Sequence, residues 1–521
     1  MKNKTKFFCS LLFITVIIIQ NGGLALAEKT PQTLRKADIS SLIKEPQFDS
    51  REYGIITPVK DQGTTSLCWA YSTVNASEAS ILRSGIDKNA SVRSLSLLPE
   101  QIGYARWNRG ADPLQNAQNN DTPTGDWENK TGSTHVAASL LSQWCGPVKY
   151  GTAPDANGWE NSAYKLETAA FINSRTTDVS IAAREKMKKA IVSYGAVTFS
   201  YIWQSERDYF KPNPKTSDTI LHACTIIGWN DNIPKENFSP GAATQNGGWL
   251  VKNSYSDKEY FYLSYDVTSE QSCAFEYVMP DTYDFNYFYD SAPNDFGLTY
   301  MKTAEAANIF EAKKGTAEKE EFITAVNVGI DGENTTCTIE VYTDTERYNP
   351  VSGTLSAVAT ENFEYAGYHT ITLNTPVKIS KGTFFSVIAK VENSDGTAYV
   401  KISNNNGNSY RKVSGNWNGY GFIVPRIKAF TKLDDNSDCY LKFAGETELL
   451  ANLPSEKSTL ILVKYEGNRI SDLNMISLDA GDFGIKKFPV PAGWKKDANT
   501  SIEAFLWSDT LNAFCPKATL E

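Results

Sequence analysis

The spacing of apolar residues predicts helices followed by strands in the first half of the chain. "CWAYSTVNASEASILRSG" (68–85) has apolar residues close to helical spacing and ends at a glycine that is a plausible helix stop. Two more stretches read as helices, and three later ones, rich in β-branched and aromatic residues, read as strands. These are "STHVAASLLSQW" (133–144), "AAREKMKKAIVSYG" (182–195), "HACTIIGW" (222–229), "GGWLVKNSY" (247–255) and "EYFYLSYD" (259–266). Residues 48–285 are therefore expected to form an α+β domain.

Beyond residue 285 the helical pattern disappears and apolar and polar positions alternate. The strands predicted for residues 286–432 are "TCTIEVYT" (336–343), "YHTITLN" (368–374), "GTFFSVIAKV" (382–391) and "FIVPRIKAFT" (422–431). An acidic connector, "KLDDNSD" (432–438), precedes a second β-region that reaches residue 521 and includes "TLILVKY" and "SIEAFLW". The expected fold is thus multidomain, with two all-β sandwiches, 286–432 and 438–521, after the α+β domain.

The first 27 residues have the pattern of a secretory signal peptide. Positive charges at the start precede an apolar run, Phe7 to Ile19, that is too short to span a bilayer, and Ala25-Leu26-Ala27 has the form of a cleavage site. Residues 28–47 are polar and are interpreted as a short leader. No later segment is long and apolar enough to span. The mature protein is therefore expected to be secreted, without a membrane span, and either extracellular or bound non-covalently to the cell surface.

Charge and cysteine content narrow the possible partners. The net charge is −9, with acidic and basic residues mixed, and the chain has neither a basic stripe nor zinc-like Cys/His spacing. Nucleic acid is therefore not expected as a partner, and no metal or cofactor is predicted.

Of the eight cysteines, Cys9 is removed with the predicted signal peptide. Seven remain, which is an odd number, so at least one thiol should stay unpaired. Cys439 and Cys515 bracket the last domain and are predicted to form a disulfide. The pairing of Cys145, Cys224, Cys273 and Cys337 stays open.

The candidate for the unpaired thiol is Cys68, in "VKDQGTTSLCWAYST" (59–73). A thiol is a useful nucleophile only as thiolate, and both a helix N-terminus and a nearby imidazole lower its pKa. Cys68 opens the first predicted helix, and His222 opens a predicted strand of the same domain. Asn253, on the next predicted strand, could hold the imidazole in one tautomer. An oxyanion would need fixed donors, which the Cys68 backbone N–H and the Gln62 side-chain amide could supply.

Three stretches of the sequence resemble papain-like cysteine peptidases. "REYGIITPVKDQGTTSLCWAYSTV" is similar to their nucleophile region, "HACTIIGWND" to their histidine strand and "GGWLVKNSY" to their asparagine strand. His222 follows Cys68 by 154 residues, near the separation of about 130–150 expected for the family. The resemblance implies a two-lobed fold, a cleft for an extended peptide, and an acyl-enzyme formed by a thiolate–imidazolium pair. It also implies that Gly132, in "TGST", receives substrate backbone.

The sequence departs from the family pattern in ways that resemble secreted bacterial, often clostridial, members. Thr65 replaces the usual half-cystine before the nucleophile, and Tyr255 stands where a tryptophan usually covers the Asn–His pair. Residues 286–432 resemble a lectin-like module found with those peptidases, which implies a cell-surface glycan as a partner. Residues 438–521 look like a generic Ig-like sandwich. Because no proposed catalytic residue lies in 286–432, this module is expected to be dispensable for hydrolysis of short peptides.

Three functions remain open on the sequence alone. The first is a secreted cysteine endopeptidase that acts on proteins or peptides. The second is a transglutaminase-like acyltransferase, which also uses Cys-Trp and a later His but places an Asp where this chain has Asn253. The third is a catalytically inactive papain-like protein that binds a surface. The complete set Gln62, Cys68, His222 and Asn253 favours the first.

Overall fold

The computed structural model describes the chain from residue 39 onward, apart from short gaps. The predicted signal peptide, 1–27, and the leader up to residue 38 lie outside the described residues. The described ranges are 39–115, 124–172, 179–204, 207–214, 220–268, 272–290, 302–316, 319–433, 439–454, 457–467, 469–479, 482, 484–497, 499–508 and 513–520. None of the helices within these ranges is long and apolar enough to cross a membrane.

Helices gather in the first part of the chain, as the sequence predicts. The long helix α3 begins at Cys68 and ends at Gly85, whose φ of 59° lets its N–H cap the Ile81 carbonyl. The helices are α2 (Ile39–Leu42), α3 (Cys68–Ser84), α4 (Pro99–Asn108), α5 (Thr134–Ser142) and α6 (Ile181–Tyr194), with 3-10 turns η1 (Ser50–Tyr53), η2 (Trp127–Asn129) and η3 (Lys235–Asn237). The three helices predicted from apolar spacing correspond to α3, α5 and α6.

The strands of this region pack against the helices and against one another. All three predicted strands form, as β5, β7 and β8, and they are neighbours in the sheet. The strands within the described residues of this region are β1 (Gln47–Asp49), β2 (Lys165–Phe171), β3 (Val197–Trp203), β4 (Tyr209–Lys211), β5 (Ile220–Asn230), β6 (Ser239–Pro240), β7 (Gly248–Lys252), β8 (Tyr260–Ser264) and β9 (Cys273–Val278). The pairs β3–β5, β5–β7 and β7–β8 are all antiparallel.

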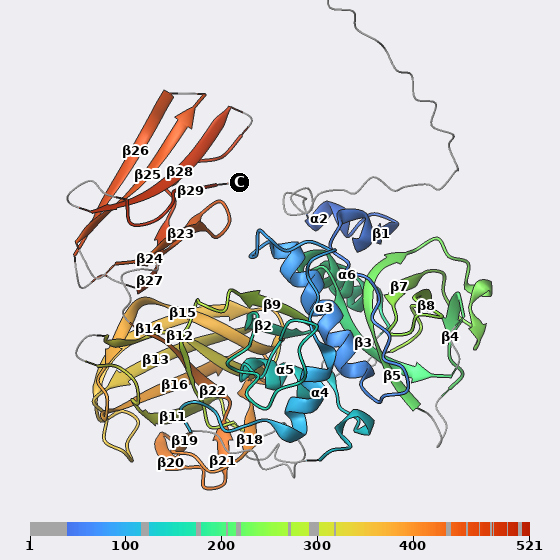
Figure 1. The fold of residues 1–521 in the computed structure, drawn as a ribbon, viewed down its shortest axis with the longest axis horizontal. Helices are drawn as coiled ribbons and strands as arrows, with labels where there is room; N and C mark the ends of the chain where they lie inside the picture. Colours follow the sequence, from blue (N-terminus) through green and yellow to red (C-terminus); the bar gives the residue numbers. More distant parts are fainter. Residues whose placement is uncertain are drawn as a thin grey trace, which may run out of the picture.

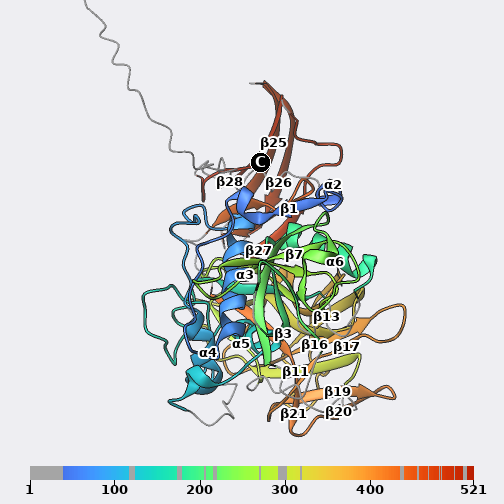
Figure 2. The ribbon, with the colours of Figure 1, turned by 90° about the vertical axis from the view of Figure 1, so that its right-hand side faces the viewer.

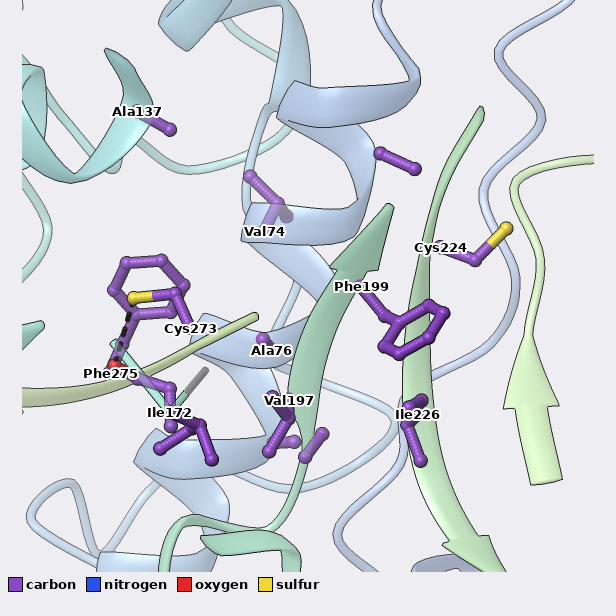
Figure 3. Close-up of a cluster of buried hydrophobic side chains, with 14 of the residues drawn as sticks. Val74, Ala76, Ala137, Ile172, Val197, Phe199, Cys224, Ile226, Cys273 and Phe275 are labelled. Atoms are coloured by element: carbon purple, nitrogen blue, oxygen red, sulfur yellow. Dashed lines mark hydrogen bonds between the residues drawn. The ribbon is translucent and has the colours of Figure 1, made fainter. Parts of the chain in front are cut away.

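The core of this region lies between α3 and the sheet. Val74 and Ala76 of α3 belong to the same buried cluster as Val197, Phe199 and Ile226 of β3 and β5, and Figure 3 shows these side chains together. Every residue of α3 from Trp69 to Leu82 is buried. A helix buried on all sides is held in place by its neighbours, so the position of its first residue, Cys68, is fixed relative to β5.

Residues 285–433 form a second, all-β region. Its strands are β10 (Phe285–Tyr287), β11 (Glu305–Glu311), β12 (Glu321–Asp331), β13 (Thr335–Thr343), β14 (Thr354–Phe363), β15 (Ala366–Ile379), β16 (Phe384–Glu392), β17 (Tyr399–Val400), β18 (Ile402–Asn404), β19 (Ser409–Val413), β20 (Asn416–Gly419), β21 (Ile423–Pro425) and β22 (Ile427–Leu433). A six-stranded sheet, β14-β13-β16-β11-β19-β20, shares one hydrophobic core with β12, β15 and β22. The predicted sandwich is thus present, and the predicted boundary at 285/286 falls inside β10.

The two regions share one continuous sheet, which the sequence does not indicate. The strand order runs β10-β22-β12-β15-β2-β9-β3-β5-β7-β8-β4-β6, and the crossing point is the antiparallel pair β15–β2 (Figure 1). At this pair Gly367 faces Ala170 with a φ of 142°, and a side chain on Gly367 would overlap the Ala169 carbonyl. Only glycine fits this close approach. The expectation of a detachable β-module therefore conflicts with the observed sheet.

A buried group of charges also joins the two regions. Arg426 and Lys428 of the β-region both contact the Asp290 carboxylate, at 3.3 and 2.7 Å, and all three side chains are fully buried. Arg426 also donates to the Ser139 hydroxyl on α5 at 2.7 Å. Removing one partner of such a cluster leaves a buried charge uncompensated, which typically costs about 3–5 kcal/mol. The helix α5 is therefore held partly by residues of the β-region.

The last region is a separate pair of small sheets, as predicted. Its strands are β23 (Tyr440–Phe443), β24 (Glu448–Leu453), β25 (Ser458–Glu466), β26 (Arg469–Leu478), β27 (Gly484–Pro489), β28 (Thr500–Ser508) and β29 (Ala518–Thr519). They form the sheets β23-β24-β27 and β26-β25-β28-β29 around one core. Both Figure 1 and Figure 2 show this region at one end of the molecule, beyond the shared sheet.

The predicted disulfide between Cys439 and Cys515 is wrong for this structure. The Cys515 side chain is a free thiol, so no bond links the two residues. Both side chains are half-buried against the core of the last region. Burial raises the pKa of the Cys515 thiol to about 11. The Cys515 side chain thus packs against the core as a small apolar group, which is a common role of unpaired cysteine.

Candidate active site

Cys68 lies at the first position of α3 and is half-buried. The residue before it, Leu67, offers no side-chain cap to the helix, so the first backbone N–H groups of α3 stay directed at this end. A helix N-terminus carries partial positive charge and stabilises a nearby anion. The structure thus places the thiol where the sequence predicts it, in surroundings that favour the thiolate.

His222 comes from β5 and connects Cys68 to Asn253. Its side chain is 5% exposed, and its Nε2 lies 3.0 Å from the Asn253 Oδ1, just beyond the end of β7. Because the amide oxygen can only accept, Nε2 carries a proton and Nδ1 is the nitrogen left for the sulfur. His222 is also hydrogen-bonded to Cys68. The three residues predicted to act together are therefore in one hydrogen-bonded row.

The pKa values of the thiol and the imidazole move in opposite directions. Burial of Cys68 opposes its ionisation, but the hydrogen bond and positive charge of His222 outweigh burial. The backbone N–H groups of Ala223 and Trp69 add to this, and the pKa of Cys68 is lowered. Burial alone would lower the pKa of His222, yet its contacts with Cys224 and Cys68 raise that pKa well above its usual range. A thiolate–imidazolium pair is the state that these shifts favour.

Asn253 is held rigidly by its own hydrogen bonds. Its Nδ2 donates to the Lys258 carbonyl at 3.0 Å, and its Oδ1 also accepts from the Ser254 N–H at 2.9 Å. The Cys224 thiol donates to the same oxygen at 3.3 Å. Cys224 follows His222 by two residues and therefore faces the same side of β5, where its thiol makes a hydrogen bond as well as packing in the core. Together these contacts fix the amide, and hence the His222 ring.

Tyr255 covers the histidine in place of the tryptophan usual in the family. Its ring stacks on the His222 ring with centroids 5.5 Å apart and an angle of 25° between the planes. Tyr201 meets the same imidazole edge-on, at 5.8 Å. The phenol and the imidazole have flat faces of similar width, so the exchange of Trp for Tyr retains shielding of the His222–Asn253 hydrogen bond.

Gln62 is buried and its amide is fixed from both ends. Its Oε1 accepts from the Ser254 hydroxyl at 2.6 Å, and its Nε2 donates to the Thr65 carbonyl at 2.7 Å. The side chain is 4% exposed. Since a primary amide has two N–H groups, one remains for an oxyanion. The sequence did not predict Ser254, although it directly follows Asn253 and orients both amides.

We expect Gln62→Ala to lower kcat by roughly 10²–10³ and to leave KM within a few-fold, because an oxyanion donor acts mainly on the transition state. Steady-state hydrolysis of a fluorogenic peptide measures both constants. Alkylation of Cys68 by iodoacetamide builds no oxyanion and serves as the control, since its rate should be unchanged. A raised KM with kcat intact would make Gln62 a substrate-positioning residue.

Gly132 lies directly against the indole of Trp69, the residue after the nucleophile. A Cβ on Gly132 would overlap the Trp69 ring. Trp69 itself is 2% exposed, so its indole is part of the packed interior. The predicted cleft glycine is thus beside the predicted nucleophile, and its lack of a side chain is a steric requirement of the packing.

Gly132→Ala is expected to destabilise the protein by about 1–3 kcal/mol through overpacking against the rigid indole. It should also reduce kcat/KM, because relief of the clash moves either the glycine segment or Trp69. Thermal unfolding and peptide hydrolysis measure the two effects. Gly125→Ala is the matched control, since a Cβ there meets nothing within 4 Å. Equal behaviour of the two variants would contradict the steric argument.

A buried ion-pair network behind α3 was missed by the sequence reasoning. Glu78, in the middle of α3 and fully buried, accepts from Lys60 at 2.7 Å, from the Thr57 hydroxyl at 2.5 Å and from the Leu97 N–H at 2.6 Å. Lys252, next to Asn253, donates to Thr57 at 3.2 Å, and burial lowers its pKa to about 7. The only sign of this network in the sequence is Glu78 itself, a single acidic residue among the small residues of "NASEAS" (75–80).

The groups that converge at this site are a thiol, an imidazole and two amides, and they do not form a metal centre. Within the described part of the chain, no group of three or more His, Cys, Asp or Glu side chains could hold a metal ion. The arrangement can carry out nucleophilic attack with proton transfer and oxyanion stabilisation.

The chain resembles known proteins in two segments. Residues 45–98 match the family model described as papain family cysteine protease, and residues 287–442 match the model described as lectin like domain. Cathepsin M of Mus musculus is 24% identical over 233 residues, which are 42% of this chain and 61% of that protein. Cysteine proteinase 15A of Pisum sativum is 46% identical over 57 residues, which are 11% and 16% of the two chains. The chain thus spans about six tenths of cathepsin M.

A solved structure shares the arrangement of both parts. It is the cysteine protease and lectin-like domains of Cwp84, a surface layer associated protein of Clostridium difficile, with a TM-score of 0.58 and 20% identity over 75% of this chain and 89% of that chain. A variant of the clostridial cysteine protease Cwp84 after propeptide cleavage also has a TM-score of 0.58, at 19% identity over 74% and 99% of the two chains. At this identity the likeness concerns the fold.

Proposed function

We propose that this chain, in which a papain-family cysteine protease domain is joined to a lectin-like domain, hydrolyses peptide bonds in protein substrates through Cys68. The observation that carries the proposal is the His222 ring, which is hydrogen-bonded to the Cys68 thiol on one side and to the Asn253 amide at 3.0 Å on the other. A nucleophile, a base and a group that orients the base are the parts that covalent catalysis requires.

In the first half of the reaction the Cys68 thiolate attacks the carbonyl carbon of the scissile bond. The carbonyl oxygen becomes an oxyanion, stabilised by the Cys68 backbone N–H and by the second N–H of Gln62. The His222 imidazolium then donates its Nδ1 proton to the leaving amine, the C–N bond breaks, and a thioester remains on Cys68.

In the second half of the reaction water replaces the departed amine. Neutral His222 accepts a proton from the water, whose oxygen attacks the thioester carbonyl, and the C–S bond breaks to release the acid and the thiolate. Asn253 keeps Nε2–H engaged throughout, so Nδ1 faces the reacting groups in both halves. Rotation of the ring is opposed by the stacked Tyr255.

We further propose that the protein acts outside the cell and that residues 286–432 bind a cell-surface glycan. The signal-like sequence of residues 1–27 supports the first part. The match to the lectin like family model supports the second. Cwp84, which has the same order of parts, is a surface layer associated protein. Export of the full-length chain from a bacterial host, with cleavage after Ala27, tests the location.

A labelling experiment separates peptidase activity from the two alternatives. The full chain without residues 1–27 is incubated with an epoxysuccinyl thiol-peptidase inhibitor, and separately with a fluorogenic peptide plus a primary amine. Peptide hydrolysis, with inhibitor bound to Cys68, is the expected result. Transfer of the amine in preference to hydrolysis would identify an acyltransferase, which the Asn in the third position disfavours. Neither labelling nor turnover would identify an inactive binding protein.

The pH dependence of Cys68 alkylation should follow the shifted pKa values. Because the pKa of Cys68 is lowered, its thiolate should react with iodoacetamide below the pH at which ordinary thiols ionise. His222→Ala removes both the hydrogen bond and the charge that lower this pKa. The pH at which Cys68 begins to react should therefore rise to that of an ordinary buried thiol. Alkylation is quenched at set times, and mass spectrometry of the peptide that contains Cys68 gives the alkylation rate at each pH. Identical profiles for both proteins would exclude the ion pair.

A further inference from the structure

Two loops of the protease part are bonded to each other at the candidate active site. One loop, residues 55–67, holds Gln62 and leads directly into Cys68; the other, residues 253–259, connects β7 to β8. Neither loop contains a helix or a strand, so no backbone ladder fixes the side chains that it carries. The position of the Gln62 amide therefore depends on the hydrogen bonds between the two loops.

Ser254 makes the first connection between the loops. The Gln62 backbone N–H donates to the Ser254 carbonyl at 2.9 Å, and the Ser254 hydroxyl donates to the Gln62 Oε1 at 2.6 Å. These two bonds hold the backbone nitrogen of Gln62 and the oxygen of its amide. They do not hold the residues on either side of Gln62.

The Asp61 carboxylate makes a second connection, one residue before Gln62. Its Oδ2 accepts from the Ser256 N–H at 3.2 Å and also from the Ser256 hydroxyl. Its Oδ1 accepts from the Gly63 N–H at 2.9 Å and so closes a turn around Gln62, in which Gly63 has a φ of 57°. One carboxylate thus shapes the turn that contains Gln62 and ties it to the second loop.

The bonds between Asp61 and Ser256 lie at the surface. Both residues are exposed, so we expect their loss to change the overall stability little. The donors favour the charged form of the carboxylate and lower the pKa of Asp61, the Ser256 hydroxyl most strongly. The carboxylate is therefore charged at neutral pH, where its hydrogen bonds are charge-assisted and stronger than those of a neutral acceptor.

We propose that Asp61 and Ser256 are positioning residues that hold the Gln62 amide where the oxyanion forms. With both loops joined at Ser254 and again at Ser256, the turn around Gln62 has two fixed points and cannot pivot about one of them. Displacement of a catalytic group by about 1 Å can cost on the order of 10² in rate, so such a fixed turn matters for the reaction even though it adds little stability. The inference rests on the proposed peptidase function and adds two residues to it.

The test measures steady-state hydrolysis of a fluorogenic peptide by the full chain without residues 1–27. Asp61→Ala and Ser256→Ala should each lower kcat roughly tenfold, less than complete loss of an oxyanion donor, and leave KM within a few-fold. Ser256→Thr keeps the hydroxyl and should retain the kcat of the unsubstituted protein. The matched control is Asp497→Ala in the last region, where an exposed carboxylate also closes a turn, on the Asn499 N–H at 2.8 Å. This variant should leave both constants unchanged.

A double-mutant cycle with Gln62 separates positioning from a general structural effect. If Asp61 acts through Gln62, Asp61→Ala should lower kcat much less in a protein that already carries Gln62→Ala than in the unsubstituted protein. Equal fold losses in the two backgrounds would overturn the inference. Alkylation of Cys68 by iodoacetamide builds no oxyanion and should keep its rate in Asp61→Ala. A rate that falls as much as kcat would place the effect of Asp61 on the thiolate instead of on Gln62.

Failure of the positioning role and failure of the proposed function give different results. If the unsubstituted protein hydrolyses the peptide while Asp61→Ala and Ser256→Ala keep its kcat, only the positioning role is wrong. An unsubstituted protein that hydrolyses no peptide would refute the proposed function, and the positioning role with it. Thermal unfolding of both variants should stay within a few degrees of the unsubstituted protein, and a large fall would assign the loss of kcat to unfolding and overturn the inference.

Discussion

Replacement of Cys68 by alanine is expected to abolish peptide hydrolysis and to leave the fold intact. The thiol is the nucleophile that we propose, and removal of a comparable nucleophile costs on the order of 10⁶ in kcat. The side chain is half-buried and small, and α3 is held by the buried residues that follow it. Loss of one sulfur at the helix end should therefore cost little stability.

The comparison needs a control thiol that lies away from the site. Cys515 serves, since it is also half-buried and unpaired but belongs to the last region. Cys515→Ala should retain full activity, and both variants should unfold within a few degrees of the parent protein. Hydrolysis of a fluorogenic peptide, after removal of contaminating proteases, gives the rates. Residual activity above a few per cent in Cys68→Ala would mean that another residue performs the chemistry.

A chain that ends near Tyr283 is expected to be insoluble or only partly folded. The cut removes β15, whose pairing partner β2 then becomes an exposed edge, and it uncovers apolar residues such as Phe171. It also removes Arg426, which holds α5 through Ser139. An exposed, apolar edge strand is an aggregation site. This expectation reverses the one drawn from the sequence, because the proposed catalytic residues lie in a part of the chain that also needs strands and side chains of the β-region.

A chain that ends after Leu433 is the matched control for this truncation. It removes the last region, whose two sheets share no strand with the rest of the described chain, so it should stay folded and active. Scanning calorimetry of that chain should show one cooperative transition for the protease and lectin-like parts together. Gly367→Ala in the full chain, which forces a side chain against the Ala169 carbonyl, should lower the midpoint of that same transition. A soluble, active chain ending near Tyr283 would show that the shared sheet is dispensable.

The helices and strands that the sequence predicts correctly follow from local patterns of apolar, β-branched and glycine residues. The start of α3 at Cys68 and its stop at Gly85 follow from apolar spacing and from the preference of glycine for positive φ. The strands that carry His222 and lead to Asn253 follow from runs of β-branched and aromatic residues. These signals work because helix and strand periods are set by nearby residues.

The order Cys68, His222, Asn253, together with Gln62, also led to the proposed chemistry before any geometry was known. Few residue types can form a thiolate–imidazolium pair, so their presence in stretches that resemble one family restricts the reaction strongly. Reasoning from the positions of Cys439 and Cys515 at the two ends of the last domain gave a wrong disulfide, since position along the chain does not say whether two residues approach each other.

Tertiary structure alone decided which distant segments became neighbours. The contact of the Thr370 hydroxyl with the Glu167 carbonyl, 2.8 Å long, joins residues 203 positions apart and belongs to the sheet shared by two regions. Two contacts of the candidate site likewise join residues that are distant in the sequence. The Cys224 thiol donates to the Asn253 side-chain oxygen, and the Tyr255 ring stacks on the His222 ring. The sequence determined which groups were available for these contacts. Their pairing depends on how the whole chain packs, because antiparallel register and side-chain burial are fixed by the partner strand and not by local period.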